Sequence, residues 1–477
     1  MPSLFRTQTT DHLLTQLREG RPLDLRQQVV LTALLSLPSI LAMVSHVLME
    51  YIDAAMVGRL GADPSASVGL MASSAWMIWG LCSSAATGFS VQVAHLIGAR
   101  DEAGARSVVR QGLTSTLLSC LAVMAVALAI SGQLPRWLGG ADEICPDATA
   151  YFRIVTLTLP FTQLVMLFSG ALRSSGNVVA PSLTNAAMCL LDVVFNFLFI
   201  FPARHVSILG VGVTVPGAGL GVRGAALGTM AAEFSAAAFL AWFVVFRSKP
   251  LRLSAERGSF LPSRRCLSRA VRIALPMGVQ HVVMTGAQVV STGIVAPLGK
   301  MSIAANSFGV TAESICYMPG YGIADAAQAL VGQSLGAGRR QLMRGFARVT
   351  VVMAMVVMSL MGVLMYFGAP LMMELLTPVG QIRELGVEAL RIEAFAEPMF
   401  AASIVCYGVF VGAGDTLKPC IMNLASIWAV RLSLAWLLAP SLGLAGVWTA
   451  MCVELCFRGL IFLARLRWGK WDRAMIK

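Results

Sequence analysis

Acidic side chains stand inside long apolar stretches of this 477-residue sequence. Asp53 follows Glu50 and His46 at spacings that keep all three on one face of a helix. Asp192 and Asn196 are also one helical turn apart, in the apolar segment LLDVVFNF. In surroundings of low dielectric constant, such carboxylates can exchange a proton or Na⁺ for a cationic ligand. These five residues are therefore the candidate site for a coupling cation or a cationic ligand. In an alternative interpretation, Glu50 and His46 pair only with each other.

A second set of ionisable residues lies in apolar stretches of the C-terminal half. Its members are Glu313, Glu393, Glu397, Arg431, Glu454 and Arg458. Because buried charges need partners, the two arginines can neutralise two of the four acids, and a pair of Glu397 with Arg431 is one hypothesis. Two interpretations follow, a structural network of ion pairs and a second binding site.

The elements that position these side chains are predicted to be membrane-spanning helices. Hydrophobic residues make up 57% of the sequence, charged residues only 13%, and the mean hydropathy is +0.75. A water-soluble domain of this composition would expose a very large apolar surface. Since roughly 20 apolar residues cross a hydrocarbon core, the apolar segments predict an all-α membrane protein with twelve spans. The predicted spans are 31–58, 68–98, 107–131, 151–173, 180–202, 218–246, 268–297, 303–335, 345–372, 388–411, 418–440 and 443–466.

The net charge of +12 could indicate either nucleic-acid binding or membrane topology. Most of the 36 lysines and arginines fall in alternate loops and in the two termini, with a dense group between Arg247 and Arg272. This distribution matches the preference for positively charged loops on the cytoplasmic side. We therefore predict a multi-pass protein of the inner (plasma) membrane, with cytoplasmic N- and C-termini and no nucleic-acid partner.

The two halves of the sequence repeat in one register. Pro38 and Pro276 are 238 positions apart, and the same offset relates Gly98 to Gly336. The offset falls later in the chain, because the first half has extra residues in the Gly- and Pro-rich stretch 200–219, which we expect to form a small hairpin on the outer side. An even number of spans between the copies predicts parallel repeats of six helices each.

The predicted organisation has five parts. They are a polar, helical tail at 1–30, a six-helix lobe at 31–246, a basic cytoplasmic linker at 247–267, a second six-helix lobe at 268–466 and a short tail at 467–477. The first tail has no apolar core behind a basic start, so we do not expect it to be a cleaved signal.

The cysteine pattern gives no indication of a metal site. Most of the ten cysteines fall inside predicted spans, where a free thiol behaves as a small hydrophobic group, and none form a CxxC pair. The nucleotide-binding pattern GxxxxGK[ST] is also missing. We therefore expect no metal and no cofactor apart from a coupling ion, H⁺ or Na⁺.

Several motifs taken together resemble the multidrug and toxic compound extrusion (MATE) family. They are YIDAAMVGRLG, HLIGARDEAGA, VGQSLGAGRR, GALRSSGN and GVFVGAGDT, and the resemblance covers nearly all of the chain beyond the tail. It implies two six-helix lobes in a V that alternates between inward-open and outward-open forms. It also implies export of mostly cationic, amphipathic small molecules in exchange for Na⁺ or H⁺, and therefore a transporter and not an enzyme.

The resemblance also favours a location for the coupling site. The DinF-like branch of the family has an Asn followed four residues later by an Asp, and Asp192 and Asn196 show the same two groups in swapped order. The acids that the NorM-like branch has in helices 7 and 10 have no counterpart here. A first-lobe site at Asp53, Asp192 and Asn196 is therefore expected. Pro38 should kink the first span and act as a conformational switch beside this site.

Two other functions are compatible with the composition. A lipid-linked precursor flippase of the same superfamily would usually line its cavity with several arginines, whereas only Arg431 and Arg458 lie inside predicted spans. A membrane-embedded enzyme, from a different class, would need a metal site or a nucleophile with a base, and HExxH is absent. We expect a monomer in the lipid bilayer that acts on a small-molecule substrate.

Overall fold

The computed structural model describes residues 8–208, 211–256 and 258–471, and most of them are helical. The N-terminal half contains α1 (Gln8–Glu19), α2 (Leu25–Gly58), α3 (Ala62–Gly98), α4 (Glu102–Ile130), α5 (Leu134–Trp137), α6 (Cys145–Ser174), α7 (Val179–Ile200), β1 (Pro202–Ile208), β2 (Val211–Ala218) and α8 (Val222–Trp242). The C-terminal half contains α9 (Arg264–Val295), α10 (Lys300–Gly336), α11 (Arg340–Leu376), α12 (Gly380–Glu393), α13 (Glu397–Gly412), α14 (Leu417–Ala425) and α15 (Leu432–Trp468).

Each of the twelve predicted spans corresponds to a helical stretch. Within the described residues, nine stretches are long and apolar enough to cross a membrane, and the bent pair of α12 and α13 makes a tenth. One of the nine runs from Leu417 to Trp468, and the left-handed backbone of Gly443, with a φ of 61°, divides it in two. The remaining span is α10, which is 37 residues long and contains the acids Glu313 and Asp325.

The prediction of one uninterrupted helix over 388–411 is wrong. Helix α12 ends at Glu393, α13 begins at Glu397, and the two axes differ by 61°. Pro398 stands in the first turn of α13. A proline there has no N–H to donate to the preceding turn, and its ring would clash with that turn. The break therefore falls just before the proline.

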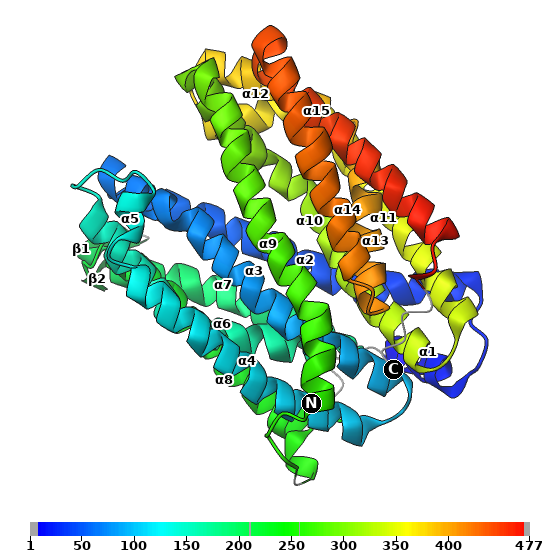
Figure 1. The fold of residues 1–477 in the computed structure, drawn as a ribbon. Helices are drawn as coiled ribbons and strands as arrows, with labels where there is room; N and C mark the ends of the chain where they lie inside the picture. The colour runs from blue at the N-terminus through cyan, green and yellow to red at the C-terminus, as the bar shows by residue number, and fades with distance from the viewer. Residues whose placement is uncertain (1–7, 209–210, 257, 472–477) are drawn as a thin grey trace.

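The helices form two groups arranged as a V (Figure 1). Helices α2 to α8 make up one group and α9 to α15 the other. The groups converge near α1, which we call the α1 end, and diverge toward the opposite end, which we call the hairpin end. Across the junction α2 packs against α10, and α3 packs against α9. These two contacts are equivalent under the internal repeat. In each of them, the first span of one half packs against the second span of the other half.

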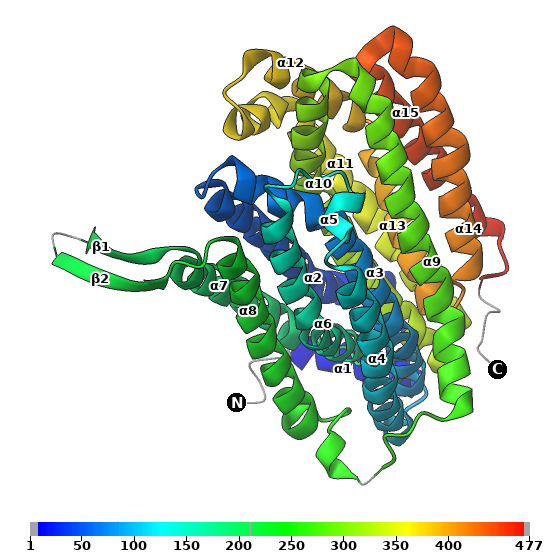
Figure 2. The ribbon, with the colours of Figure 1, turned by 60° about the vertical axis from the view of Figure 1, so that its left-hand side comes forward.

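The extra residues of the first half form the expected hairpin. Strands β1 and β2 pair antiparallel, from Pro202 opposite Ala218 to Ile208 opposite Val211. Figure 2 shows the hairpin projecting away from the helices beyond α7 and α8. The prediction of a small β-hairpin at 200–219 is therefore confirmed.

Two buried arginines of α4 hold the segment that joins the two groups. Arg110 Nη2 donates to the carbonyl oxygen of Leu253 at 2.9 Å, and Arg106 Nη2 lies 2.7 Å from Glu256 Oε1. Leu253 begins a single turn of 3-10 helix (Leu253–Ala255), and carbonyl groups that such a short turn leaves unpaired need donors of this kind when they are buried. The basic linker is thus attached to the first group before α9 begins.

The cysteines pack as expected from the sequence. All ten are free, and eight of them are buried. Among the described residues, no group of three or more His, Cys, Asp and Glu side chains could hold a metal ion.

Candidate functional site

Three of the predicted site residues meet between α2 and α7. Asn196 Nδ2 donates to Asp53 Oδ1 at 2.8 Å and to Asp192 Oδ2 at 2.9 Å. Asp192 is 1% exposed and Asn196 is fully buried. One amide therefore bridges two carboxyl groups that are 139 positions apart in the sequence, and we call these three residues the carboxyl triad.

Close packing of α8 against α7 fixes the bridging amide. A Cβ atom on Gly228 would lie 2.0 Å from Asn196 Oδ1, and one on Gly224 would lie 2.4 Å from the carbonyl oxygen of Phe199. Only glycine allows two helices to approach this closely. The spacing of the two glycines in GAALG was a signal for this contact, and the sequence analysis missed it.

The carboxyl triad has oxygen atoms to offer to a cation. Both hydrogens of the Asn196 amide are used on the two carboxyl groups. Asn196 Oδ1 and Asp192 Oδ1 are buried, and neither has a hydrogen-bond partner among the described residues. Carboxylate and amide oxygens are the ligands that hard cations prefer, and two neighbouring carboxyl groups can also share a proton. The arrangement therefore suits the binding of H⁺ or Na⁺.

His46 and Glu50 lie on the same helix as Asp53 but contact each other. His46 Nδ1 lies 3.9 Å from Glu50 Oε1, and both side chains are partly exposed. No hydrogen bond in the described part of the chain joins either of them to the carboxyl triad. This geometry matches the alternative interpretation, in which the two residues form a local pair, and their part in a binding site stays a prediction.

In the second lobe, both arginines contact the same acid. Glu454 is fully buried, and its carboxylate lies 3.2 Å from Arg431 Nε, 3.0 Å from Arg458 Nε and 2.6 Å from Ser426 Oγ. The hypothesis of a Glu397–Arg431 pair is therefore wrong, because Arg431 pairs with Glu454. Arg458 is one turn from Glu454 on α15. Arg431 is 23 positions before Glu454, and it reaches the same carboxylate because α15 is divided at Gly443 and its second part packs against the segment that contains Arg431.

Among the described residues, no arginine lies within ion-pair distance of the other three acids of this set. Glu313 is 5% exposed, and Glu393 and Glu397 are fully buried on either side of the break between α12 and α13. None of the four carboxyl oxygens of Glu393 and Glu397 has a hydrogen-bond partner among the described residues. An unpaired carboxylate in such surroundings carries a large desolvation cost, which a bound proton or cation removes.

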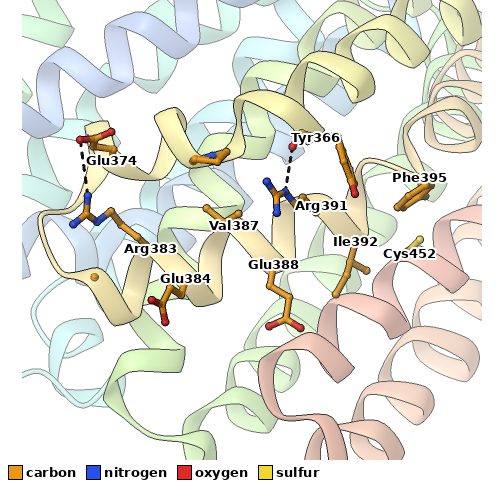
Figure 3. A pocket seen from close by; sticks show the side chains of 12 residues that line it. Tyr366, Glu374, Arg383, Glu384, Val387, Glu388, Arg391, Ile392, Phe395 and Cys452 are labelled. Carbon is orange, nitrogen blue, oxygen red and sulfur yellow. Dashed lines mark hydrogen bonds and ion pairs between the residues drawn. The ribbon is translucent and has the colours of Figure 1, made fainter.

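A cavity with a volume of about 1000 Å³ lies elsewhere, over α11 and α12 toward the hairpin end (Figure 3). Arg391 points toward Tyr366, with Nε 3.4 Å from the carbonyl oxygen and the guanidinium 5.5 Å from the ring centre. Arg383 lies 3.9 Å from Glu374. None of the residues that line this cavity belongs to the carboxyl triad or to the buried acids of the second lobe.

A family model named MatE matches the chain twice, over residues 38–198 and 276–437. The two matches begin 238 positions apart, which is the register of the internal repeat, and together they cover well over half of the sequence. The chain belongs to the MatE family. This confirms the resemblance seen in the motifs, and it makes the protein a transporter and not an enzyme.

Relatives and solved structures agree with this assignment. The chain is 24% identical over 445 residues to the "Probable multidrug resistance protein NorM" of Thermotoga maritima, covering 93% of each chain. It is 27% identical to the protein of that name from Pseudomonas aeruginosa, covering 92% of this chain and 90% of the relative. The structure described as "Crystal structure of MATE in complex with MaL6" superposes with a TM-score of 0.86 at 21% identity, over 97% of this chain and 98% of the other.

These findings confirm the fold class, which is an all-α membrane protein with two repeated six-helix lobes in a MATE-like V. They leave the DinF-like subtype a prediction, since the relatives described above are named NorM.

Proposed function

We propose that this MatE-family protein is an antiporter that couples export of cationic or amphipathic small molecules to entry of H⁺ or Na⁺ by alternating access. Support comes from the family, from relatives named as multidrug resistance proteins, and above all from the carboxyl triad of the first lobe. The triad has two carboxyl groups and unpartnered oxygens inside a helical bundle, where one cation can replace another.

The proposed coupling works by competition for the same carboxyl groups. A substrate cation and a coupling ion that both bind Asp53 and Asp192 exclude each other, so binding of one releases the other. If the coupling ion favours one conformation and the substrate the other, each shifts the population by its differential affinity. Pro38 lies fifteen residues before Asp53 inside α2 and is the proposed switch, because a proline removes one backbone hydrogen bond and lets the helix bend there.

The proposed setting is the inner (plasma) membrane, with the α1 end in the cytoplasm and the hairpin outside. It rests on the excess of Lys and Arg in the segments at the α1 end. The lobes at 31–246 and 268–466, joined by the basic linker at 247–267, are the proposed moving units, and the monomer is the proposed working form.

A second cation site in the other lobe is a further part of this proposal. Glu313, Glu393 and Glu397 are buried, and no arginine of the described residues forms an ion pair with them, so a proton or cation can stabilise them. Arg431 and Arg458 both contact Glu454 and are therefore not available to hold the phosphates of a lipid-linked precursor. This contact argues against the flippase alternative.

Reconstituted vesicles provide the test of the proposed coupling. Purified protein in proteoliposomes is given a fluorescent cation, ethidium, under an imposed Na⁺ gradient and, separately, an imposed pH gradient. We expect one gradient to drive ethidium transport and the Asp53→Asn variant to lose that transport, because the change removes a titrating charge at nearly constant volume. Asp63→Asn is the matched control, since Asp63 is an exposed acid in the first turn of α3.

Two outcomes of this experiment would contradict the proposal. Full gradient-driven transport by Asp53→Asn would remove the first-lobe site, and no response of the unaltered protein to either gradient would remove ion coupling.

A further inference from the structure

The two lobes contact each other at the α1 end, where α3 and α10 end. We call this contact region the seam, and its contacts follow the internal repeat. A Cβ atom on Gly98 of α3 would lie 2.1 Å from the carbonyl oxygen of Gln333, and one on Gly336 of α10 would lie 1.9 Å from that of His95. Both residues of one contact are 238 positions from their counterparts in the other. The closing ends of α3 and α10 therefore touch backbone to backbone, in two equivalent places.

Two side-chain hydrogen bonds that are related by the repeat also join the lobes at the seam. His95 Nε2 lies 2.8 Å from the carbonyl oxygen of Gly412, and Gln333 Nε2 donates to that of Ser174 at 2.8 Å. These two contacts are again related by 238 positions. The core of the seam is thus nearly symmetric between the lobes.

Helix α1 is present on only one side of this symmetric seam. Arg18 Nε and Nη2 both lie 3.1 Å from Gln333 Oε1, and Nη2 donates to the carbonyl oxygen of Ser175 at 2.9 Å. Ser175 follows α6 of the first lobe, and Gln333 belongs to α10 of the second. One guanidinium group therefore joins the two lobes.

The last turn of α1 and the residues after it are held from both lobes as well. Arg100, just after α3, donates through Nε to the carbonyl oxygen of Arg18 at 2.9 Å. Arg339, just before α11, donates through Nη1 to the carbonyl oxygen of Arg21 at 2.6 Å. Separation of the lobes at this end must break at least one of these two sets of bonds.

An apolar seat holds the rest of α1. Leu14 and Leu17 are 1% and 0% exposed and belong to one packed cluster with Leu330, Leu342 and Phe346 of the second lobe.

On the other side of the repeat, part of the linker takes the equivalent place, because Leu251 and Leu253 are buried in one packed cluster with Val108. At the positions 238 lower, the residues are Gln92, Gly104 and Val108, and they line an open cavity of about 380 Å³. A long helix packed at this place, α1, is therefore found on one side among the described residues, whereas the other side has the linker.

We propose that α1 is a latch that holds the lobes together at the α1 end and so favours the form of the V that is open at the hairpin end. This proposal depends on the alternating-access function proposed above, because the latch would oppose the step in which the α1 end opens. Removing its bonds should raise the fraction of molecules with the α1 end open. Because hydrogen bonds to a charged group are stronger than those between neutral groups, we expect loss of the Arg18 bonds to raise that fraction at least tenfold, which corresponds to about 1.4 kcal/mol.

Distance measurements between two spin labels test the latch without requiring transport. The labels are placed at Ala103→Cys on α4 and Gln341→Cys on α11, which are exposed first-turn positions on opposite lobes, in full-length protein whose ten native cysteines are replaced. Arg18→Ala and deletion of residues 1–19 are compared with the parent protein in lipid nanodiscs. Arg21→Ala is the matched control, because the Arg21 side chain contacts Glu19 within the same segment and is mostly exposed.

We expect Arg18→Ala and the deletion to populate a longer label distance, and Arg21→Ala to leave the distribution unchanged. An unchanged distribution in Arg18→Ala would overturn the latch, whether or not the deletion variant folds. An equal shift in Arg21→Ala would overturn it too, because it would show a general effect of charge at this end. If the distance lengthens but the parent protein shows no ion-driven transport, the latch stands and the proposed antiport fails.

Discussion

The buried acids of this protein differ in what their oxygens contact. Glu454 has two arginines and a serine, the carboxyl triad shares one asparagine amide, and Glu393 and Glu397 have no hydrogen-bond partner among the described residues. A buried ion pair and a buried unpaired carboxyl group respond in opposite ways to neutralisation. Stability measurements can therefore separate the structural acids from the candidate cation sites.

Replacing Glu454 should destabilise the fold, while replacing Glu397 should not. Glu454→Gln leaves the buried Arg458 and the partly buried Arg431 without a counter-charge, and breaking such a buried pair typically costs about 3–5 kcal/mol. Glu397→Gln keeps the volume and removes a charge that has no partner, so we expect equal or greater stability. The midpoint of thermal unfolding in detergent measures both, and equal losses in the two variants would contradict the assignment of Glu454 as the structural acid.

At the scale of elements, the carboxyl triad depends on how closely α8 approaches α7. The amide that bridges the two carboxyl groups lies directly under a helix that has glycine at both contact positions, Gly224 and Gly228. The geometry of the site is therefore set by backbone packing as much as by the polar residues themselves.

Gly228→Ala should disrupt the site without unfolding the protein. The new methyl group would lie 2.0 Å from Asn196 Oδ1, so the amide must move away from Asp53 and Asp192. Overpacking of this kind costs about 1–3 kcal/mol, and we expect loss of most ion-driven export with a modest fall in the unfolding temperature. Gly69→Ala is the control, because a Cβ atom there meets nothing within 4 Å. Wild-type export by Gly228→Ala would show that the position of Asn196 is unimportant.

For the whole molecule, the symmetry of the backbone contrasts with the asymmetry of the charges. The register of 238 places Ser291 opposite Asp53 and Val430 opposite Asp192, so neither carboxyl group of the triad has a copy in the second lobe. The second lobe instead has Glu393 and Glu397 at the helix break. Ion coupling is therefore expected to reside mainly in the first lobe.

Binding of a cationic substrate should consequently weaken as the pH falls or as Na⁺ rises, because H⁺ or Na⁺ then occupies the carboxyl groups that the substrate needs. This dependence should vanish in Asp53→Asn/Asp192→Asn and persist in Glu393→Gln. Equilibrium binding of a fluorescent cation to purified protein at several pH values and Na⁺ concentrations provides the measurement. Persistence in the double variant together with loss in Glu393→Gln or Glu397→Gln would move the coupling site to the second lobe.

The sequence by itself determined the membrane class, the approximate positions of the spans, the repeat and the hairpin, but not the break between α12 and α13. These features follow from local composition and from periodic agreement along the chain, which need no knowledge of tertiary contacts. The acids of the candidate sites were also evident, because an ionisable residue stands out in an apolar segment. One helical turn between Asp192 and Asn196 was enough to place them together.

Only the tertiary structure decided which of these residues contact each other. Asp53 and Asn196 meet because α2 packs against α7, and both arginines of the second lobe contact Glu454 and not Glu397. The contacts that hold α1 against both lobes likewise join residues more than 150 positions apart, such as Arg18, Ser175 and Gln333. Spacing along one helix fixes which side chains share a face, but partners on other helices depend on how those helices approach, and here glycine contacts such as Gly228 and Gly336 set that approach.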